Sequence, residues 1–176
     1  LMSKLPISIL AATLLAPGPI EAAPRHLVAF GDSTTAVRGK LNVYAKRLAK
    51  ELPGVKLTNV GIGGNHTVLA RKRFAKDVLN RKPDVVVIQF GINDAAFDVW
   101  KKPPAKTPRV PQAAYQDNLK HFIRGCRGIG ATPILMSPNP LRWTEKLRKL
   151  YGKPPYEPDK TDGFNVVLRQ YAETVR

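Results

Sequence analysis

Three short polar segments, each following an apolar run, hold the residues that could do chemistry. They are Gly31-Asp32-Ser33, the glycine-rich stretch 59–65 and the stretch 91–94, which contains Asn93. Ser33 offers a hydroxyl nucleophile, the glycines offer backbone N–H groups, and Asn93 offers a side-chain amide. One nucleophile with two hydrogen-bond donors is what acyl transfer needs, because the donors stabilise the oxyanion formed on the attacked carbonyl.

Each segment alone also has a purely structural explanation. Gly-Asp-Ser favours a turn, and Asn93 with Asp94 could bond their own backbone in an Asx turn. The glycines could instead cradle a phosphate, but the stretch lacks both G-x-G-x-x-G spacing and a following Lys-Ser or Lys-Thr pair. Nucleotide binding is therefore disfavoured, and the succession of all three segments indicates a catalytic site.

The elements that must position these segments alternate between apolar runs and amphipathic stretches, which predicts an α/β fold with a parallel sheet. We expect strands at 27–30, 55–60, 84–90 and 133–137 and helices at 41–52, 70–79, 115–126, 143–151 and 164–176. The carboxyl ends of parallel strands share one edge, so the three segments should meet there. Ser33 should lie in a tight turn between the first strand and the helix that follows it, whose amino end would favour negative charge.

Composition places the chain among single-domain globular proteins: it has 176 residues, of which 43% are hydrophobic. Residues 1–23 resemble a secretory signal peptide, with Lys4, an apolar stretch at 5–16 and small residues at Ala22 and Ala23. We therefore expect export to the periplasm or the extracellular space, with residues 24–176 as the domain. No other stretch is apolar over the roughly 18 residues that an integral span needs.

Net charge and cysteine content indicate which classes of partner and cofactor the chain could bind. With 29 Lys and Arg against 13 Asp and Glu, the net charge of +16 favours anionic partners. The basic residues are spread through helices and loops without a nucleic-acid-binding motif, so no nucleic acid is expected. Cys126 is the single cysteine and falls on an expected buried helical face. Without a His-x-x-x-His or Cys pair, we expect no metal and no other cofactor.

In their order and spacing, the three segments resemble the SGNH hydrolases, also called GDSL-type esterases and lipases. The resemblance implies a flavodoxin-like three-layer α/β/α fold with Ser33 as nucleophile. The amides of Ser33 and Gly64 and the side chain of Asn93 would form the oxyanion hole. Gly64 is chosen over Gly61 because the family's glycine is usually followed by Asp or Asn and then closely by Thr. The supporting residues would be Asp32, Gly61 and Asp94.

The chain departs from the family at its general base. The family carries a C-terminal Asp-x-x-His block, and no such spacing occurs here. Of the three histidines, His26 begins the first strand, His121 lies within a helix, and His66 follows the glycine-rich stretch as a weak candidate. We therefore expect the catalytic His and Asp to be absent from this chain. We also expect the chain to be a fragment that ends before a final strand and is inactive alone.

The expected function is a serine esterase that hydrolyses carboxylic esters through an acyl-enzyme. Gly-Asp-Ser-Thr-Thr resembles the carbohydrate acetylesterase branch, so an acetylated or anionic polysaccharide is a candidate substrate. The alternative is a non-catalytic secreted basic domain that binds polyanions. Aromatic residues in the loops at 95–112 and 138–162 could line the pocket or buttress the loops; they are Trp100, Trp143, Tyr151 and Tyr156.

Overall fold

The computed structural model describes residues 24–176, so the expected signal peptide lies outside the described residues. The four strands of the described part form one parallel sheet in the order β2-β1-β3-β4. This confirms the expected parallel α/β architecture. The strands are β1 (His26–Gly31), β2 (Lys56–Asn59), β3 (Val85–Gln89) and β4 (Thr132–Met136).

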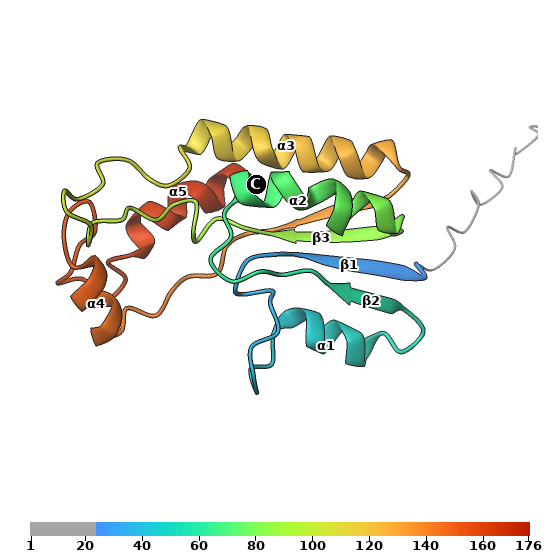
Figure 1. The fold of residues 1–176 in the computed structure, drawn as a ribbon. Helices are drawn as coiled ribbons and strands as arrows, with labels where there is room; N and C mark the ends of the chain where they lie inside the picture. The colour runs from blue at the N-terminus through green and yellow to red at the C-terminus, as the bar shows by residue number, and fades with distance from the viewer. Residues whose placement is uncertain (1–23) are drawn as a thin grey trace, which may run out of the picture.

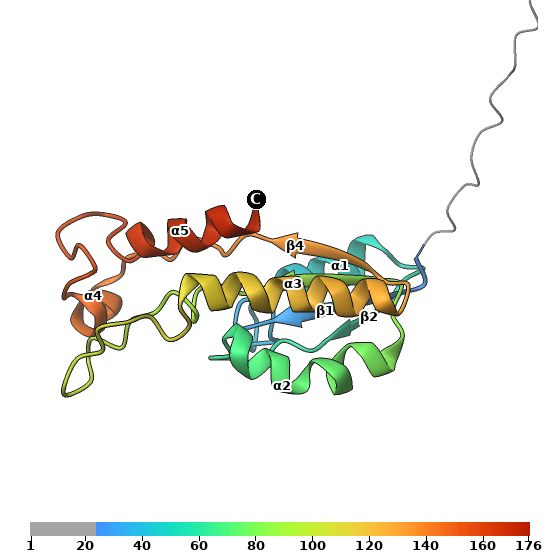
Figure 2. The same cartoon turned by 90° about the horizontal axis from the view of Figure 1, so that it is seen from above.

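Helices cover both faces of the sheet, and the long loops gather beyond the carboxyl ends of the strands (Figure 1). Helices α2 and α3 lie side by side on one face, and α1 lies on the other (Figure 2). The helices are α1 (Tyr44–Glu51), α2 (Thr67–Asp77), the 3-10 turn η1 (Leu79–Arg81), α3 (Gln112–Gly128), α4 (Glu145–Tyr151) and α5 (Asn165–Val175). None of these helices is long and apolar enough to cross a membrane.

Alternation along β1 explains the layers. Val28 and Phe30 pack into the core beneath α2 and α3, whereas Ala29 packs with Val43 and Ala45 at α1. The Phe30 ring lies 5.6 Å from that of Phe74 on α2, and further aromatic rings fill the same layer. Strand β3 is buried along four of its five residues, as its uninterrupted apolar run predicts for a central strand.

The inward face of α3 matches its sequence pattern. Tyr115, Leu119, Phe122 and Cys126 are all buried, one helical turn after another. Burial raises the pKa of the Cys126 thiol to about 11, so little thiolate forms at neutral pH. Cys126 is therefore a packing residue, as expected.

The expectation that the Ser33 turn brings the amino end of the next helix to the serine is wrong. After β1 the chain makes one turn, in which the amides of Thr35 and Ala36 donate to the Asp32 carbonyl. Helix α1 begins only at Tyr44, because the residue before it, Val43, has an extended backbone with φ −65° and ψ 155°. No helix amino end is therefore aimed at Ser33 from this segment.

The sheet face that holds α1 is only partly covered by residues 24–176. Beside α1 runs a groove of about 570 Å³, lined mainly by aliphatic side chains of β1, β3 and β4. Ile134 on β4 is 46% exposed there, although strand residues of its kind usually pack against a covering layer. The apolar residues from the strands are Leu27, Val85, Val87, Ile134 and Met136.

Candidate active site

The turn that carries Ser33 is fixed from both sides. The carboxylate of buried Asp32 accepts hydrogen bonds from the backbone amide and the hydroxyl of Thr34, both at 2.8 Å. Gly31 leaves no space for a side chain, because an added Cβ would lie 2.1 Å from the Thr35 hydroxyl oxygen. Ser33 therefore sits half-buried at the end of β1 in a turn that its neighbours hold in place.

The glycine-rich loop packs directly against this turn. A Cβ added at Gly61 would lie 2.4 Å from the backbone nitrogen of Ala36, so the two backbones touch here. The Gly61 amide donates to Asn59 Oδ1, and Asn59 Nδ2 donates to the Thr35 carbonyl at 2.7 Å. Gly61 thus has a packing role, which is what a supporting glycine requires.

Gly63 and Gly64 form the centre of a tight turn beside Ser33. The Asn65 amide closes the turn onto the Ile62 carbonyl, and Gly64 has a φ of 74°. A Cβ added at Gly63 would lie 3.9 Å from Ser33 Cβ, which places the turn next to the serine. Within residues 24–176, neither glycine amide has a hydrogen-bond acceptor, so both remain able to donate to a ligand.

Asn93 joins the third segment to the other two. Its Nδ2 donates to the Asn65 carbonyl at 2.9 Å and lies 3.5 Å from Asp32 Oδ2. Its Oδ1 accepts from Arg109 Nη1 at 3.3 Å. The predicted convergence is therefore present in the fold: Asn93 contacts both the residue that precedes Ser33 and the glycine-rich loop.

Asp94 has a structural role. Its Oδ1 accepts from both the amide and the hydroxyl of Thr67, the first residue of α2. Its Oδ2 is buried without a hydrogen-bond partner among the described residues. Burial raises the pKa of Asp94 to about 6, against the lowering effect of the Thr67 bonds. Burial likewise raises the pKa of Asp32, although the Thr34 bonds oppose it.

Arg73 on α2 is a site-supporting residue that sequence reasoning missed. Its guanidinium donates to the carbonyls of Val60 and Gly31 and to Asn65 Oδ1, at 2.7–3.1 Å. It therefore ties the glycine-rich loop to the end of β1. The basic run at 71–73 is typical of solvated surface. Arg73, however, follows buried Ala70 by three residues and so lies on the same face of the helix, and this spacing was the sequence signal that could have identified Arg73.

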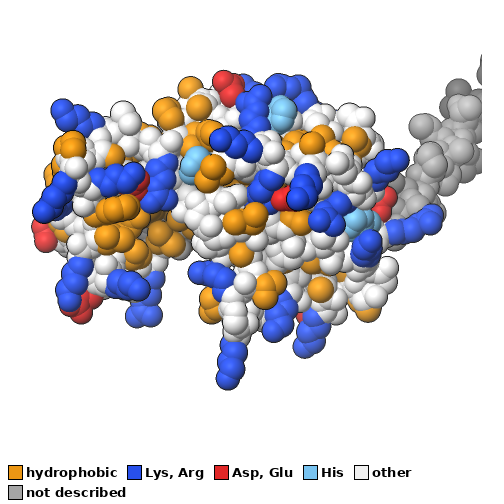
Figure 3. Space-filling view, in the orientation of Figure 1, with side chains coloured by type: hydrophobic (Ala, Val, Ile, Leu, Met, Phe, Trp, Pro, Cys, Tyr) orange, Lys and Arg blue, Asp and Glu red, His pale blue; other side chains and the backbone are white. Residues whose placement is uncertain are grey.

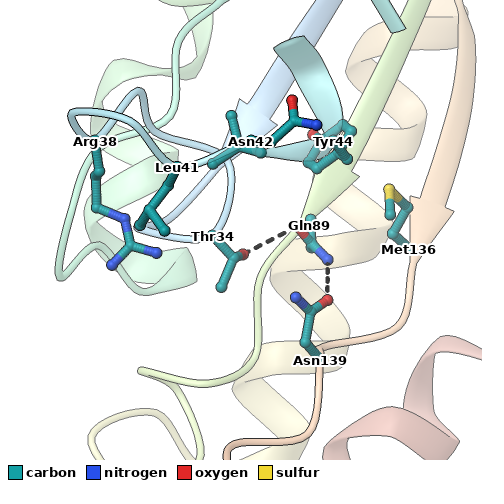
Figure 4. A pocket seen from close by; sticks show the side chains of 9 residues that line it. Thr34, Arg38, Leu41, Asn42, Tyr44, Gln89, Met136 and Asn139 are labelled. Atoms are coloured by element: carbon teal, nitrogen blue, oxygen red, sulfur yellow. Dashed lines mark hydrogen bonds between the residues drawn. The ribbon is translucent and has the colours of Figure 1, made fainter. Parts of the chain in front are cut away.

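Gln89 is the second residue that sequence reasoning missed. It is 2% exposed at the end of β3, and its Oε1 accepts from the Thr34 hydroxyl at 2.9 Å. Its Nε2 donates to Asn139 Oδ1 at 2.7 Å, so it joins the Ser33 turn to the segment after β4 (Figure 4). A polar residue within the apolar run of β3 was the available signal. These residues border a pocket of about 270 Å³ that Arg38 and Tyr44 also line.

None of the histidines of the described part hydrogen-bonds to Ser33. His26 Nε2 pairs with Thr58 Oγ1 at the start of β1, and His121 packs against Phe74. His66 precedes α2 and lines a pocket of about 610 Å³ that also contacts Gly64. Across residues 24–176, no group of three or more His, Cys, Asp or Glu side chains could hold a metal ion.

Of the four aromatic residues in the loops, three support the loop packing and one lines a pocket. Trp143 and Tyr156 are buried and pack with Phe164, and Tyr151 packs its ring edge against Tyr156 at 5.5 Å. These three buttress the loop after β4. Trp100 is 45% exposed and lines the 610 Å³ pocket, so it is the aromatic that can contact a ligand.

Comparison with known proteins gives one family and several relatives. The model of the GDSL-like lipase/acylhydrolase family matches residues 29–176. An uncharacterized lipoprotein of Bacillus subtilis (strain 168), YqeF, is 39% identical over 125 residues, which cover 65% of this chain and 49% of that protein. An acetylxylan esterase of Geobacillus stearothermophilus is 33% identical over 88 residues, which cover 48% of this chain and 38% of that esterase. The chain thus spans about half the length of the first relative and less of the second.

Solved structures show the same fold. A lipase/acylhydrolase from Enterococcus faecalis superposes with a TM-score of 0.60 at 28% identity, covering 86% of this chain and 69% of its own. An acetylxylan esterase from Geobacillus stearothermophilus superposes with a TM-score of 0.56 at 25% identity, covering 86% of this chain and 73% of that esterase. Variants of that esterase with a serine or an aspartate replaced by alanine are catalytic mutants.

Proposed function

The chain belongs to the GDSL-like lipase/acylhydrolase family, and on that basis we propose that it carries the nucleophile and the oxyanion donors of an exported serine esterase. The proposed substrates are acetyl esters of carbohydrates, which the acetylxylan esterase relatives support. The observation that carries the proposal is the bond from Asn93 Nδ2 to the Asn65 carbonyl. It holds the asparagine amide against the glycine-rich loop, whose turn packs beside Ser33.

In the proposed reaction, Ser33 Oγ attacks the ester carbonyl carbon. The new C–O bond forms as the carbonyl electron pair moves to oxygen, and the oxyanion accepts hydrogen bonds from Gly64 N–H and Asn93 Nδ2. The proton of Ser33 Oγ passes to the general base as the serine attacks. When the tetrahedral intermediate collapses, the bond to the alcohol oxygen breaks and the base gives that proton to the leaving alcohol. Water then attacks the acyl-serine by the same route and releases the acid.

The donors are suited to this role because their hydrogens are available. One Nδ2 hydrogen of Asn93 is held by Asn65, and the other faces only Asp32 Oδ2 at 3.5 Å, a weak bond that an oxyanion can displace. Arg109 holds Oδ1 and so prevents the amide from turning over. Removing one oxyanion donor typically costs about 2.7–4 kcal/mol of transition-state stabilisation.

The general base is the part of the mechanism that residues 24–176 do not supply in this proposal. His66 is the histidine nearest the glycine turn in sequence, but it has no hydrogen bond to Ser33. Serine without a base is a poor nucleophile, and removing the triad histidine of a serine protease lowers turnover by a factor on the order of 10⁶. We therefore expect the 176 residues alone to hydrolyse p-nitrophenyl acetate no faster than their Ser33→Ala variant.

The test uses the protein at the full length that its gene encodes, assayed on p-nitrophenyl acetate and on acetylated xylan. Ser33→Ala should reduce kcat by a factor on the order of 10⁴ or more. Ser137→Ala, which removes a hydroxyl from a different pocket, lined also by Leu168 and Arg169 of α5, should leave kcat unchanged. Unaltered turnover in the Ser33→Ala protein would refute the proposal.

The charge distribution supports the second candidate, a non-catalytic basic domain that binds polyanions. Lys and Arg side chains greatly outnumber acidic ones over the face shown in Figure 3, in keeping with the net charge of +16. The same proteins decide between the two. Absence of Ser33-dependent hydrolysis, combined with salt-sensitive retention on an immobilised acidic polysaccharide, would favour the binding domain.

A further inference from the structure

The 610 Å³ pocket adjoins the proposed oxyanion donors and lies between the glycine-rich turn and the loop before α3. Gly64 lies on one wall, and residues 98–109 form the other. Arg109 belongs to that wall and also donates to Asn93 Oδ1. A group bound in the pocket would therefore lie next to both Gly64 and Asn93, where the remainder of an ester substrate must go. Its volume is in the range of small-molecule sites.

The loop wall has more positive than negative charge. Arg109 donates through Nε and Nη2 to Asp98 Oδ1 at 2.9 and 2.7 Å, and Lys101 Nζ lies 2.8 Å from Asp98 Oδ2. One carboxylate thus faces two cations, which leaves the loop wall with an excess of positive charge. The Lys101 side chain is 55% exposed and has hydrogens left to donate.

His66 on the opposite wall responds to this field. Burial lowers its pKa first, and the charges of Arg109 and Lys72 lower it further. Its Nδ1 is buried and makes no hydrogen bond within residues 24–176. At neutral pH the ring is therefore uncharged, and the excess charge of the pocket comes from the loop cations.

Trp100 gives the pocket a flat apolar surface. It is 45% exposed, and the ammonium group of Lys101 lies 5.6 Å from the centre of its ring. An exposed aromatic face beside hydrogen-bond donors suits a sugar ring, which stacks its C–H face and bonds through its polar groups. The lining also contains Asp98, Thr107 and Arg109, so it is too polar for a fatty acyl chain.

We propose that this pocket binds an acidic sugar of the carbohydrate to which the acetyl ester is attached, with its carboxylate on Lys101 and Arg109 and its ring on Trp100. The proposal rests on the proposed function and narrows its substrates from carbohydrate esters to esters of uronic-acid-containing chains. The carboxylate selects the substrate through charge, and the tryptophan holds the ring in either a neutral or an acidic sugar.

The test measures binding independently of hydrolysis, with the protein at the full length that its gene encodes. Trigalacturonate and xylotriose, an acidic and a neutral probe, are titrated by calorimetry at low salt. Trigalacturonate should bind at least tenfold more tightly, and the difference should shrink as salt is added. Lys101→Met should abolish most of the preference, whereas Trp100→Ala should weaken both ligands.

Lys102→Met is the matched control, because it removes the same charge from the next position, which does not line the pocket. It should change trigalacturonate affinity by less than about twofold. Equal binding of the two trisaccharides, or an unchanged preference in Lys101→Met, would overturn the inference. The proposed function has a separate test. If trigalacturonate binds through Lys101 but hydrolysis does not depend on Ser33, the esterase proposal is refuted and the pocket proposal is not.

Discussion

Thr67 donates twice to the same oxygen of Asp94, once from its backbone amide and once from its hydroxyl. Thr67 begins α2 directly after the glycine-rich loop, and Asp94 follows Asn93 after β3. The pair therefore connects the two segments that hold the proposed oxyanion donors. Asn118 Nδ2 on α3 donates to the Thr67 hydroxyl, so a third element supports the connection.

The buried Asp94 carboxyl should make stability depend on pH. Its pKa is about 6 in the folded protein against 3.8 in the reference state. The folded protein holds the proton more tightly, so this contribution to stability is full below about pH 4 and is lost as pH rises through 6. The shift corresponds to about 3 kcal/mol. Urea unfolding of wild type and Asp94→Asn should therefore show wild type losing that much relative to the variant between pH 4 and 7.5.

Asp98→Asn is the control for this titration. Burial raises the pKa of Asp98, but the hydrogen bonds from Arg109 and Lys101 outweigh it, and the net pKa is lowered. Its stabilising contribution is lost only as pH falls below its usual range. The stability difference between wild type and Asp98→Asn should stay level from pH 4 to 7.5. A level difference for Asp94→Asn would contradict a raised pKa.

Arg109 should act on catalysis through Asn93. Without Arg109, the Asn93 carboxamide can rotate, so Arg109→Met in the protein at the full length that its gene encodes should lower kcat on p-nitrophenyl acetate about tenfold. Asn93→Ala should lower kcat by about 10²–10³. In a double-mutant cycle, Arg109→Met should have no further effect once Asn93 is replaced. Additive losses would show that Arg109 acts by another route, since this substrate has no sugar to bind.

Neighbouring glycines should respond differently to alanine. Gly61→Ala places a methyl group against the Ala36 backbone and should destabilise the fold by about 3 kcal/mol or more. Gly63→Ala has room and should cost less than about 1 kcal/mol. The methyl group nevertheless faces Ser33, so kcat/KM of the full-length protein for acetylated xylan should fall. Urea unfolding and initial rates separate the two effects, and equal destabilisation by both would rule out the packing role of Gly61.

Arg73→Met should loosen the loop that Arg73 ties down. The change removes the donors of the Gly31 and Val60 carbonyls and of Asn65 Oδ1, at an expected cost of about 2–4 kcal/mol. Lys72→Met changes an exposed cation at the next position and should stay within about 0.5 kcal/mol of wild type. Chemical unfolding measures both, and similar values would mean that the Arg73 bonds add nothing to stability.

The sheet and the chemistry-bearing segments could be predicted from sequence because both depend on local patterns. The run Val85–Ile88 is apolar enough to require burial on both faces, and strand order along the chain brings the three segments to one edge. Arg73 and Gln89 could not be assigned in the same way. Arg73 bonds to Gly31 and Gln89 bonds to Thr34, which lie 42 and 55 residues away in sequence, so these contacts are defined only once the backbone has folded.

The start of α1 shows a different limit. Apolar spacing from Leu41 onward predicts a helix there, but Leu41 is 54% exposed and the helix begins at Tyr44. Periodicity identifies the helix and not its first residue, which depends on whether the preceding backbone can adopt helical angles. Val43, with φ −65° and ψ 155°, is extended, so the helix begins after it and Ser33 lies in a separate turn.

The groove beside α1 has a consequence for how residues 24–176 behave in concentrated solution. Copies carrying a net charge of +16 repel one another, while the aliphatic groove around Ile134 attracts. The Debye length shrinks from about 30 Å at 0.01 M salt to about 3 Å at 1 M, so added salt weakens only the repulsion. Light scattering should show copies dispersed in dilute buffer and clustering as ionic strength rises, and Ile134→Lys should postpone the clustering. Purification at high salt would then select against the monomer.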